Sequence, residues 1–223
     1  MKIGVLALQG DVPEHLAALE PLLPPGSVLP VRTPEDLAAV DALILPGGES
    51  TTIAALLEKT GLWRALSGRL ERGLPVLATC AGLILLAKDL ETTSEGRNPP
   101  TLGALDVVVR RNDYGAQRES FEGPVSFDPV VGAPYPGVFI RAPRIVTVRP
   151  GVTAVAHRDG EVVGVRRGPV VGLTFHPELS SDPRIHQWFL SEVVARAQPA
   201  RASQTHTTRR AAKRTDATAT HHQ

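Results

Sequence analysis

Two spacings of apolar residues alternate along the first part of the chain. Short, almost continuous apolar runs, typical of buried strands, occupy residues 2–8, 27–31, 41–48 and 74–79. Between these runs the spacing becomes helical, at 12–23, from 33 onward, and at 50–58, 61–72 and 82–90. Thr33 and Pro34 suit the cap and the first position of a helix. This order predicts βαβ units, in which helices connect the strands of a parallel sheet.

The pattern changes after residue 100. Strand-like segments follow one another with little helix between them, at 104–109, 138–142, 145–149 and 153–175. Asp159 and Gly160 form a two-residue hairpin signal. A last helix is expected from about 182 to 197. The chain is therefore predicted to be an α/β protein with a mostly parallel sheet and an antiparallel extension at one edge.

The composition indicates a cytoplasmic protein with no membrane span. The 223 residues are 42% hydrophobic and include one cysteine, which rules out an intramolecular disulfide and suits a reducing compartment. The apolar run at the N-terminus is short and is soon followed by Asp11 and Glu14, unlike a signal peptide. No segment approaches the roughly 20 apolar residues that cross a bilayer.

The charge is unevenly distributed. Residues 198–223 hold five of the 24 Lys/Arg residues but one of the 23 Asp/Glu residues, and almost nothing large and apolar. We therefore predict a domain over 1–197 and a disordered basic tail over 198–223. The domain is mildly acidic, which argues against nucleic-acid binding. A nucleic-acid arm is the alternative for the tail, and His221 and His222 alone are weak grounds for a metal site.

The single cysteine lies in "VLATCAGLILLAK", where a strand is expected to turn into a helix. Ligands of open α/β sheets bind at the carboxyl ends of the strands. A side chain on such a turn projects outward, and the helix N-terminus favours a thiolate. Gly82 permits close packing of strand and helix. Cys80 is thus a candidate nucleophile, whereas the alternative is a small buried apolar residue.

A thiolate nucleophile needs a base and a group that orients the base. In "VVGLTFHPEL", His176 ends an apolar strand and Glu178 follows two residues later. If the segment is extended, both side chains face the same side, so that Glu178 can hold one ring nitrogen while the other faces Cys80. Without Cys80, the same segment would be read as an ordinary strand end.

The third candidate is the loop "LPGGESTT" at 45–52, which follows another strand of the same sheet. Gly47 and Gly48 allow the backbone to expose N–H groups that could bind an oxyanion. Ser50 and Thr51 are expected to cap the next helix. The loop is not a phosphate-binding P-loop, because the lysine of that motif is missing.

Together, "LPGGEST", "TCAGLILLAK" and "FHPEL" resemble the class I (triad) glutamine amidotransferases. "GVLALQGDVPEH", "RRNDYGAQ" at 110–117 and "VFIRAP" at 138–143 make the chain similar to the glutaminase subunits of pyridoxal 5′-phosphate synthases. The resemblance covers about residues 2–195. It implies a flavodoxin-like three-layer fold, no cofactor and no metal.

The resemblance also implies roles for individual residues. Cys80 would attack the side-chain amide of L-glutamine and form a thioester, His176 would transfer protons, and Glu178 would orient His176. The amides of Gly48 and Ala81 would hold the oxyanion. The positions that match the family's glutamine-binding motifs are Gly48, Glu49, Ser50, Arg111, Ile140 and Arg141.

The family further implies a partner, a (β/α)8-barrel synthase that uses the ammonia with ribose 5-phosphate and glyceraldehyde 3-phosphate, in a large hetero-oligomer. Ala78 and Ala116 depart from the pattern, which usually has Gly and Arg there. Two alternatives remain open: a glutaminase serving another synthase, such as imidazole glycerol phosphate synthase, and a catalytically silent scaffold.

The tail is predicted to be dispensable. Because residues 198–223 lack apolar periodicity, deleting them should leave the melting temperature and the glutamine turnover unchanged, and their amide signals should be sharp and poorly dispersed. A large loss of stability on deletion would mean that the tail docks on the domain.

Overall fold

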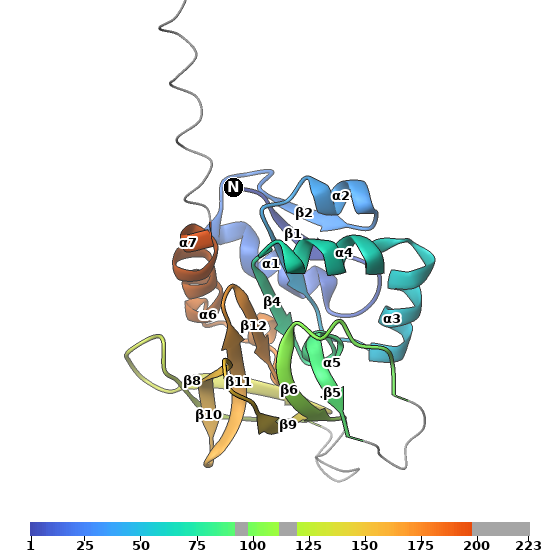
Figure 1. Ribbon diagram of the computed structural model, residues 1–223. Helices are drawn as coiled ribbons and strands as arrows, with labels where there is room; N and C mark the ends of the chain where they lie inside the picture. The colour runs from blue at the N-terminus through green and yellow to red at the C-terminus, as the bar shows by residue number, and fades with distance from the viewer. Residues whose placement is uncertain (92–97, 112–119, 198–223) are drawn as a thin grey trace, which may run out of the picture.

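The computed structural model describes residues 1–91, 98–111 and 120–197. The expectations for the tail at 198–223, for Ala116 and for most of "RRNDYGAQ" lie outside these residues. The centre is a nine-stranded sheet in the order β2-β1-β3-β4-β12-β11-β10-β7-β8 (Figure 1). Its parallel half comprises β1 Ile3–Leu6, β2 Val28–Val31, β3 Ala42–Leu45, β4 Val76–Thr79 and β12 Val170–Leu173.

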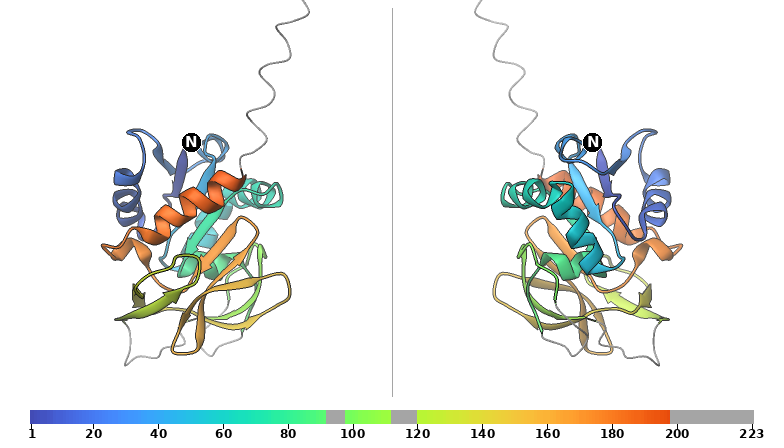
Figure 2. Two further views of the ribbon diagram at one scale, coloured as in Figure 1. Left: turned by 90° about the vertical axis from the view of Figure 1, so that its left-hand side faces the viewer. Right: turned by 90° about the vertical axis from the view of Figure 1, so that its right-hand side faces the viewer.

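Helices cover both faces of the parallel half, as Figure 2 shows from two sides. One face buries an apolar cluster under four helices: α2 Pro34–Ala38, α3 Ser50–Lys59, α4 Leu62–Glu71 and α5 Ala81–Leu86. The other face is covered by α1 Val12–Leu19, which continues as a 3-10 turn over Glu20–Leu22, and by the C-terminal helix. That helix comprises α6 Arg184–Trp188, a π-helical stretch Phe189–Val194 and α7 Ala195–Ala197. The predicted three-layer α/β fold is confirmed.

Sequence patterns located several local features correctly. Thr33 caps α2 in a capping box with Asp36, and Pro34 is the first helical residue. Leu19 is fully buried on the inner face of α1, where partly buried leucines pack beside it. Asp159 and Gly160 both have positive φ in the turn between two antiparallel strands. No helix among the described residues is both apolar and long enough to cross a membrane.

The predicted antiparallel extension is present. It comprises β11 Glu161–Arg167, β10 Thr153–Arg158, β7 Ser120–Phe127 and β8 Tyr135–Ile140. A separate three-stranded sheet, not anticipated, contains β5 Ala87–Leu90, β6 Leu105–Arg110 and β9 Arg144–Val148. The helix expected over 82–90 was wrong in its second half, because α5 ends at Leu86 and the backbone of Ala87 becomes extended. Pairing of β5 with β6 overrides the helical propensity of "AKDL".

Strand β7 and the first half of β8 were missed. Their apolar alternation is interrupted by Gly123-Pro124 and Pro136-Gly137, which face each other across the two strands. Proline is tolerated because β8 is an edge strand and β10 pairs with β7 only near its end, at Ser126 and Phe127.

The junction of β4 and α5 depends on a close approach between backbones. A Cβ atom at Gly82 would lie 2.2 Å from the carbonyl oxygen of Leu45 in β3. Because this oxygen belongs to the backbone of a buried parallel strand, it cannot move aside as the end of a side chain could. Gly82 therefore lets α5 begin directly over the carboxyl ends of β3 and β4.

Gly82→Ala is expected to lower the free energy of unfolding by about 2–3 kcal/mol through overpacking. The matched control is Gly68→Ala in α4, where a new Cβ would meet only the end of the Arg72 side chain at 3.4 Å. That change should be neutral or stabilise the protein by up to about 1 kcal/mol. Urea denaturation measures both, and equal effects would contradict the packing argument.

Candidate active site

Cys80 adopts an unusual backbone conformation between β4 and α5. Its φ and ψ are 47° and −105°, and it is one of three non-glycine residues with positive φ in the described part of the chain. Its amide donates to the carbonyl of Leu173 at 2.9 Å, which continues the pairing of β4 with β12. The residue is 7% exposed, and its thiol lies 3.8 Å from the carbonyl oxygen of Ile140. This is the sharp turn that the sequence predicted for a nucleophile.

His176 lies just beyond the carboxyl end of β12 and is 4% exposed. Its amide donates to the carbonyl of Val138 at 2.8 Å, which fixes it against β8. Its Nδ1 is 2.8 Å from Oε1 of Glu178 and 3.2 Å from Oδ2 of Asp11. Among the described residues its Nε2 has no hydrogen-bond partner, so this nitrogen is left for the thiol.

The contact between His176 and Glu178 forms in a way that the sequence did not predict. Pro177–Leu179 is a 3-10 turn, not an extended segment. The turn is closed by the amide of Leu179, which donates to the carbonyl of His176 at 3.3 Å. Pro177 suits the first position of such a turn, so the turn brings the Glu178 carboxylate back to the ring.

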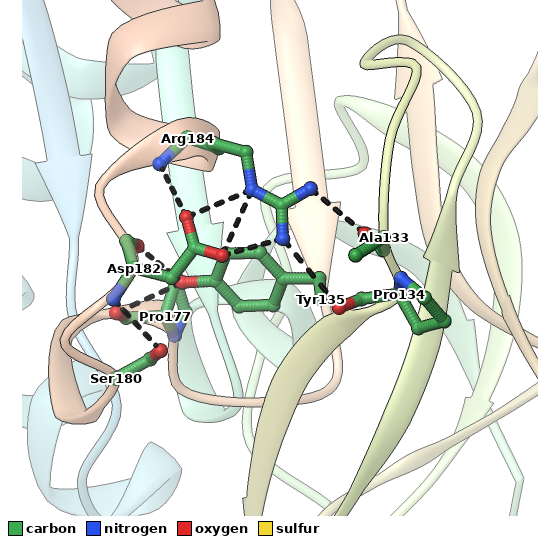
Figure 3. Close-up of polar contacts among 7 residues, drawn as sticks. All are labelled: Ala133, Pro134, Tyr135, Pro177, Ser180, Asp182 and Arg184. Atoms are coloured by element: carbon green, nitrogen blue, oxygen red, sulfur yellow. Dashed lines mark hydrogen bonds and ion pairs between the residues drawn. The ribbon is translucent and has the colours of Figure 1, made fainter.

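Residues of β8 and α6 hold this turn from outside (Figure 3). The hydroxyl of Tyr135 lies 3.3 Å from the carbonyl oxygen of Pro177 and 2.9 Å from that of Asp182. Arg184 binds the Asp182 carboxylate through Nε and Nη2, and its Nη1 donates to the carbonyl of Ala133 at 2.8 Å. The turn that carries Glu178 is therefore fixed on both sides.

The pKa values of His176 and Glu178 follow from their burial and from the side chains around them. Burial alone would lower the pKa of His176, but the neighbouring side chains of Asp11, Cys80 and Glu178 raise it well above its usual value. Burial would raise the pKa of Glu178, but the neighbouring imidazoles of His15 and His176 lower it strongly. An ionised Glu178 beside a basic His176 is thus the favoured state at neutral pH.

The glycine loop after β3 lies at the same edge of the sheet as Cys80. Gly47 packs against the His176 ring, where a Cβ atom would come within 2.6 Å of Cε1. Gly48 has a φ of 148°, and a Cβ there would lie 2.5 Å from Oε1 of Gln9. Ala81 begins α5 after the neighbouring strand β4, so its amide has no carbonyl within the helix to bind.

The cap of α3 was predicted wrongly. Ser50 is the first helical residue and is buried, whereas Glu49 is the cap and accepts from the amides of Thr51 and Thr52. Burial acts to raise the pKa of Glu49, but these bonds and that of the Thr52 hydroxyl lower it. A carboxylate caps a helix as well as a hydroxyl does, and it carries a charge to the mouth of the site.

The remaining sequence candidates surround the same point. An Nη2 atom of Arg111 lies 3.5 Å from Oε1 of Glu49, which links the end of β6 to the glycine loop. Ile140 presents its carbonyl to the thiol of Cys80. Arg141 follows with a φ of 41° and an exposed side chain. The structure thus brings all of the predicted site residues to one edge of the sheet.

Known proteins with similar sequences agree with this arrangement of the site. The sequence model of the SNO glutamine amidotransferase family matches residues 5–195. The chain belongs to this family. The "Pyridoxal 5'-phosphate synthase subunit PdxT" of Pyrococcus furiosus is 50% identical over 202 residues, which cover 87% of this chain and 100% of the relative. The protein of the same name from Streptomyces coelicolor is 47% identical over 193 residues, 86% of this chain and 94% of the relative.

A solved structure described as a glutamine amidotransferase superposes with a TM-score of 0.79 at 42% identity. It covers 87% of this chain and 100% of its own. The class I glutamine amidotransferase resemblance drawn from the motifs is confirmed at the level of both family and fold.

Ala78, where the resemblance led us to expect glycine, lies within β4 and is fully buried. It pairs with Leu45 on one side and Gly172 on the other. Its φ is not positive, so alanine is accommodated without backbone strain.

Three residues of the N-terminal segment belong to the site although the sequence did not assign them to it. Gln9 accepts from the amide of Glu49 at 2.9 Å, Asp11 contacts His176, and Nε2 of His15 lies 3.4 Å from Oε2 of Glu178. The one signal in the sequence was the residue type of His15, because a histidine among the leucines of a helix is unusual, and the structure shows that it is fully buried. Asp11, His176 and Glu178 also offer atoms within 4.8 Å of one another, but hydrogen bonds to His176 account for this cluster.

The raised pKa of His176 should make stability depend on pH. Such a group stabilises the fold fully below its unfolded pKa, near 6.5, and the contribution is lost as pH rises toward the folded value. The free energy of unfolding should therefore decline above about pH 6.5, and Asp11→Asn should flatten this decline. Urea denaturation between pH 6 and 9 measures both effects. An unchanged slope in the variant would contradict the role of Asp11.

Proposed function

We propose that this protein is the glutaminase subunit of a pyridoxal 5′-phosphate synthase, which hydrolyses L-glutamine to L-glutamate and ammonia. The observation that supports it most directly is the position of Cys80 on a strained turn beside a histidine whose other nitrogen is held by Glu178. Both relatives are named as a subunit of that synthase, and this chain aligns with nearly the whole length of each.

Cys80 is assigned as the nucleophile that attacks the side-chain amide carbon of glutamine. The thiol turns from the carbonyl of Ile140 toward Nε2 of His176, which takes its proton. The C–N bond of the tetrahedral intermediate breaks as His176 protonates the leaving ammonia, and a γ-glutamyl thioester remains. Water, deprotonated by His176, then releases glutamate. Glu178 orients the ring throughout and stabilises its charged form.

The oxyanion is assigned to the amides of Gly48 and Ala81, at the ends of adjacent strands. The glutamine is held by the surrounding positions, which are Gly48, Glu49, Ser50, Arg111, Ile140 and Arg141. Arg111 and Glu49 already contact each other, so a substrate ammonium and carboxylate would find one group of each charge at the mouth.

The ammonia is proposed to pass to a (β/α)8-barrel synthase, with ribose 5-phosphate and glyceraldehyde 3-phosphate as its further substrates, in a large cytoplasmic hetero-oligomer. The partner would also activate the glutaminase. Two adjacent glycines leave the oxyanion loop with many accessible backbone states, and a partner that binds only the competent one raises its population. Gln9, which accepts from Glu49, places the N-terminal segment at this loop.

The test is glutamate release by the chain alone and during titration with the barrel synthase. Turnover should rise on binding, because one misplaced oxyanion donor costs roughly 3–4 kcal/mol of barrier. Cys80→Ala should lower turnover by roughly a thousandfold or more while still binding the synthase. His176→Asn should lose nearly as much, and Glu178→Gln less, because Glu178 orients the ring and transfers no proton.

Normal turnover by Cys80→Ala would refute the assignment of the nucleophile. Equal turnover with and without bound synthase would refute activation alone and leave the glutaminase assignment standing. A larger loss in Glu178→Gln than in His176→Asn would contradict the division of roles.

A further inference from the structure

The fully buried imidazole of His15 has no part in the chemistry described so far. It lies on α1, on the face of the sheet away from α5, and its Nε2 is 3.2 Å from the hydroxyl of Thr79 and 3.4 Å from Oε2 of Glu178. A buried polar ring costs free energy unless its contacts repay it. Both polar contacts of Nε2 are with groups at the active site.

The surroundings of His15 determine where its proton lies. An ionised carboxylate only accepts hydrogen bonds, so a bare lone pair on Nε2 facing Glu178 would be repulsive. Nε2 therefore carries the proton, which it donates to the hydroxyl of Thr79. Oε1 of Glu178 faces His176 and Oε2 faces His15, which means that each carboxylate oxygen has an imidazole beside it. Oε2 has no hydrogen-bond partner among the described residues, so the contact with His15 at 3.4 Å acts on it through charge.

Thr79 connects this arrangement to the glycine loop. Its hydroxyl oxygen also accepts from the amide of Gly47 at 3.1 Å, and a hydroxyl oxygen has two lone pairs for these two donors. Thr79 is fully buried and immediately precedes Cys80. One hydroxyl thus joins the loop before the oxyanion amide, the strand that carries the nucleophile and the imidazole that faces Glu178.

We propose that His15 and Thr79 are positioning residues, which fix the carboxylate of Glu178 and the glycine loop at Gly47 relative to each other. The inference rests on the proposed function, because it assigns a purpose to the geometry of Cys80, His176 and Glu178. If one member shifts, the base and the oxyanion loop lose their mutual alignment. The expected result is a loss of kcat with little change in KM, because neither residue touches the mouth of the site.

Two pairs of variants test this in the complex with the synthase. Thr79→Val keeps the shape and removes the hydroxyl, whereas Thr79→Ser keeps it. Thr79→Val should lower kcat by about tenfold to a hundredfold with KM nearly unchanged, and Thr79→Ser should remain within about threefold of the parent. His15→Leu removes the donor, and His15→Gln restores an N–H near the position of Nε2 and should recover much of the rate.

The pH profile separates positioning from a merely structural role. The titratable groups around Glu178 are Asp11 just before α1, His15 on α1, Tyr135 on β8, His176 after β12 and His186 on α6. Because His15 lowers the pKa of Glu178, His15→Leu should move the acid limb of the kcat/KM profile to higher pH. His186→Leu is the matched control. It is equally buried and packs edge-on to His15, but its Nε2 has no hydrogen-bond partner among the described residues.

The control should leave the acid limb in place, because burial lowers the pKa of His186 and keeps its ring uncharged near neutral pH. The proposal is overturned if Thr79→Val keeps the parental kcat, or if His15→Gln is no better than His15→Leu and the acid limb stays in place. If His15→Leu does not fold, the comparison of kcat between Thr79→Val and Thr79→Ser tests the proposal by itself. Failure of this inference is distinct from failure of the proposed function, since Cys80→Ala would then remain inactive while these variants turn over normally.

Discussion

The architecture depends on one strained residue, Cys80, held with a positive φ between a buried strand and a short helix. A side-chain-bearing residue in this region costs of order 1–3 kcal/mol, and it persists only where the surroundings determine it. Here the Cys80 amide is bonded to Leu173, and Gly82 lets α5 lie directly against the carbonyl of Leu45. The strands on both sides of β4 therefore fix the thiol at the carboxyl edge of the sheet.

The histidine opposite the thiol is defined by acceptors from two distant parts of the chain. Glu178 approaches its Nδ1 from the following turn, and Asp11 approaches from the segment after β1. Hydrogen bonds of Tyr135 on β8 and Arg184 on α6 hold the turn that carries Glu178 in place (Figure 3). Because each of these elements lies at the same edge of the sheet, folding of the whole domain is needed before the imidazole is oriented.

The sequence was sufficient for the features that local pattern determines. Apolar runs located the parallel strands, and the order of Cys80, His176 and the glycine loop placed the site, because parallel strands end at a common edge. It was insufficient where long-range pairing decides, as in β5, whose helical propensity yields to pairing with β6. It also missed Asp11 and His15, since nothing in their spacing shows that α1 packs beside the turn after β12. Glu49 was overlooked as a cap because hydroxyl residues stand next to it.

The covalent bond between Cys80 and the substrate, formed while His176 transfers the protons, can be trapped during turnover. The complex is quenched with acid while it hydrolyses glutamine, and the mass of the peptide that contains residue 80 is measured. We expect an added γ-glutamyl group on Cys80, released by mild base, and none in Cys80→Ala. Sustained glutamate production with no adduct at any time of quenching, or with the adduct on another residue, would contradict this mechanism.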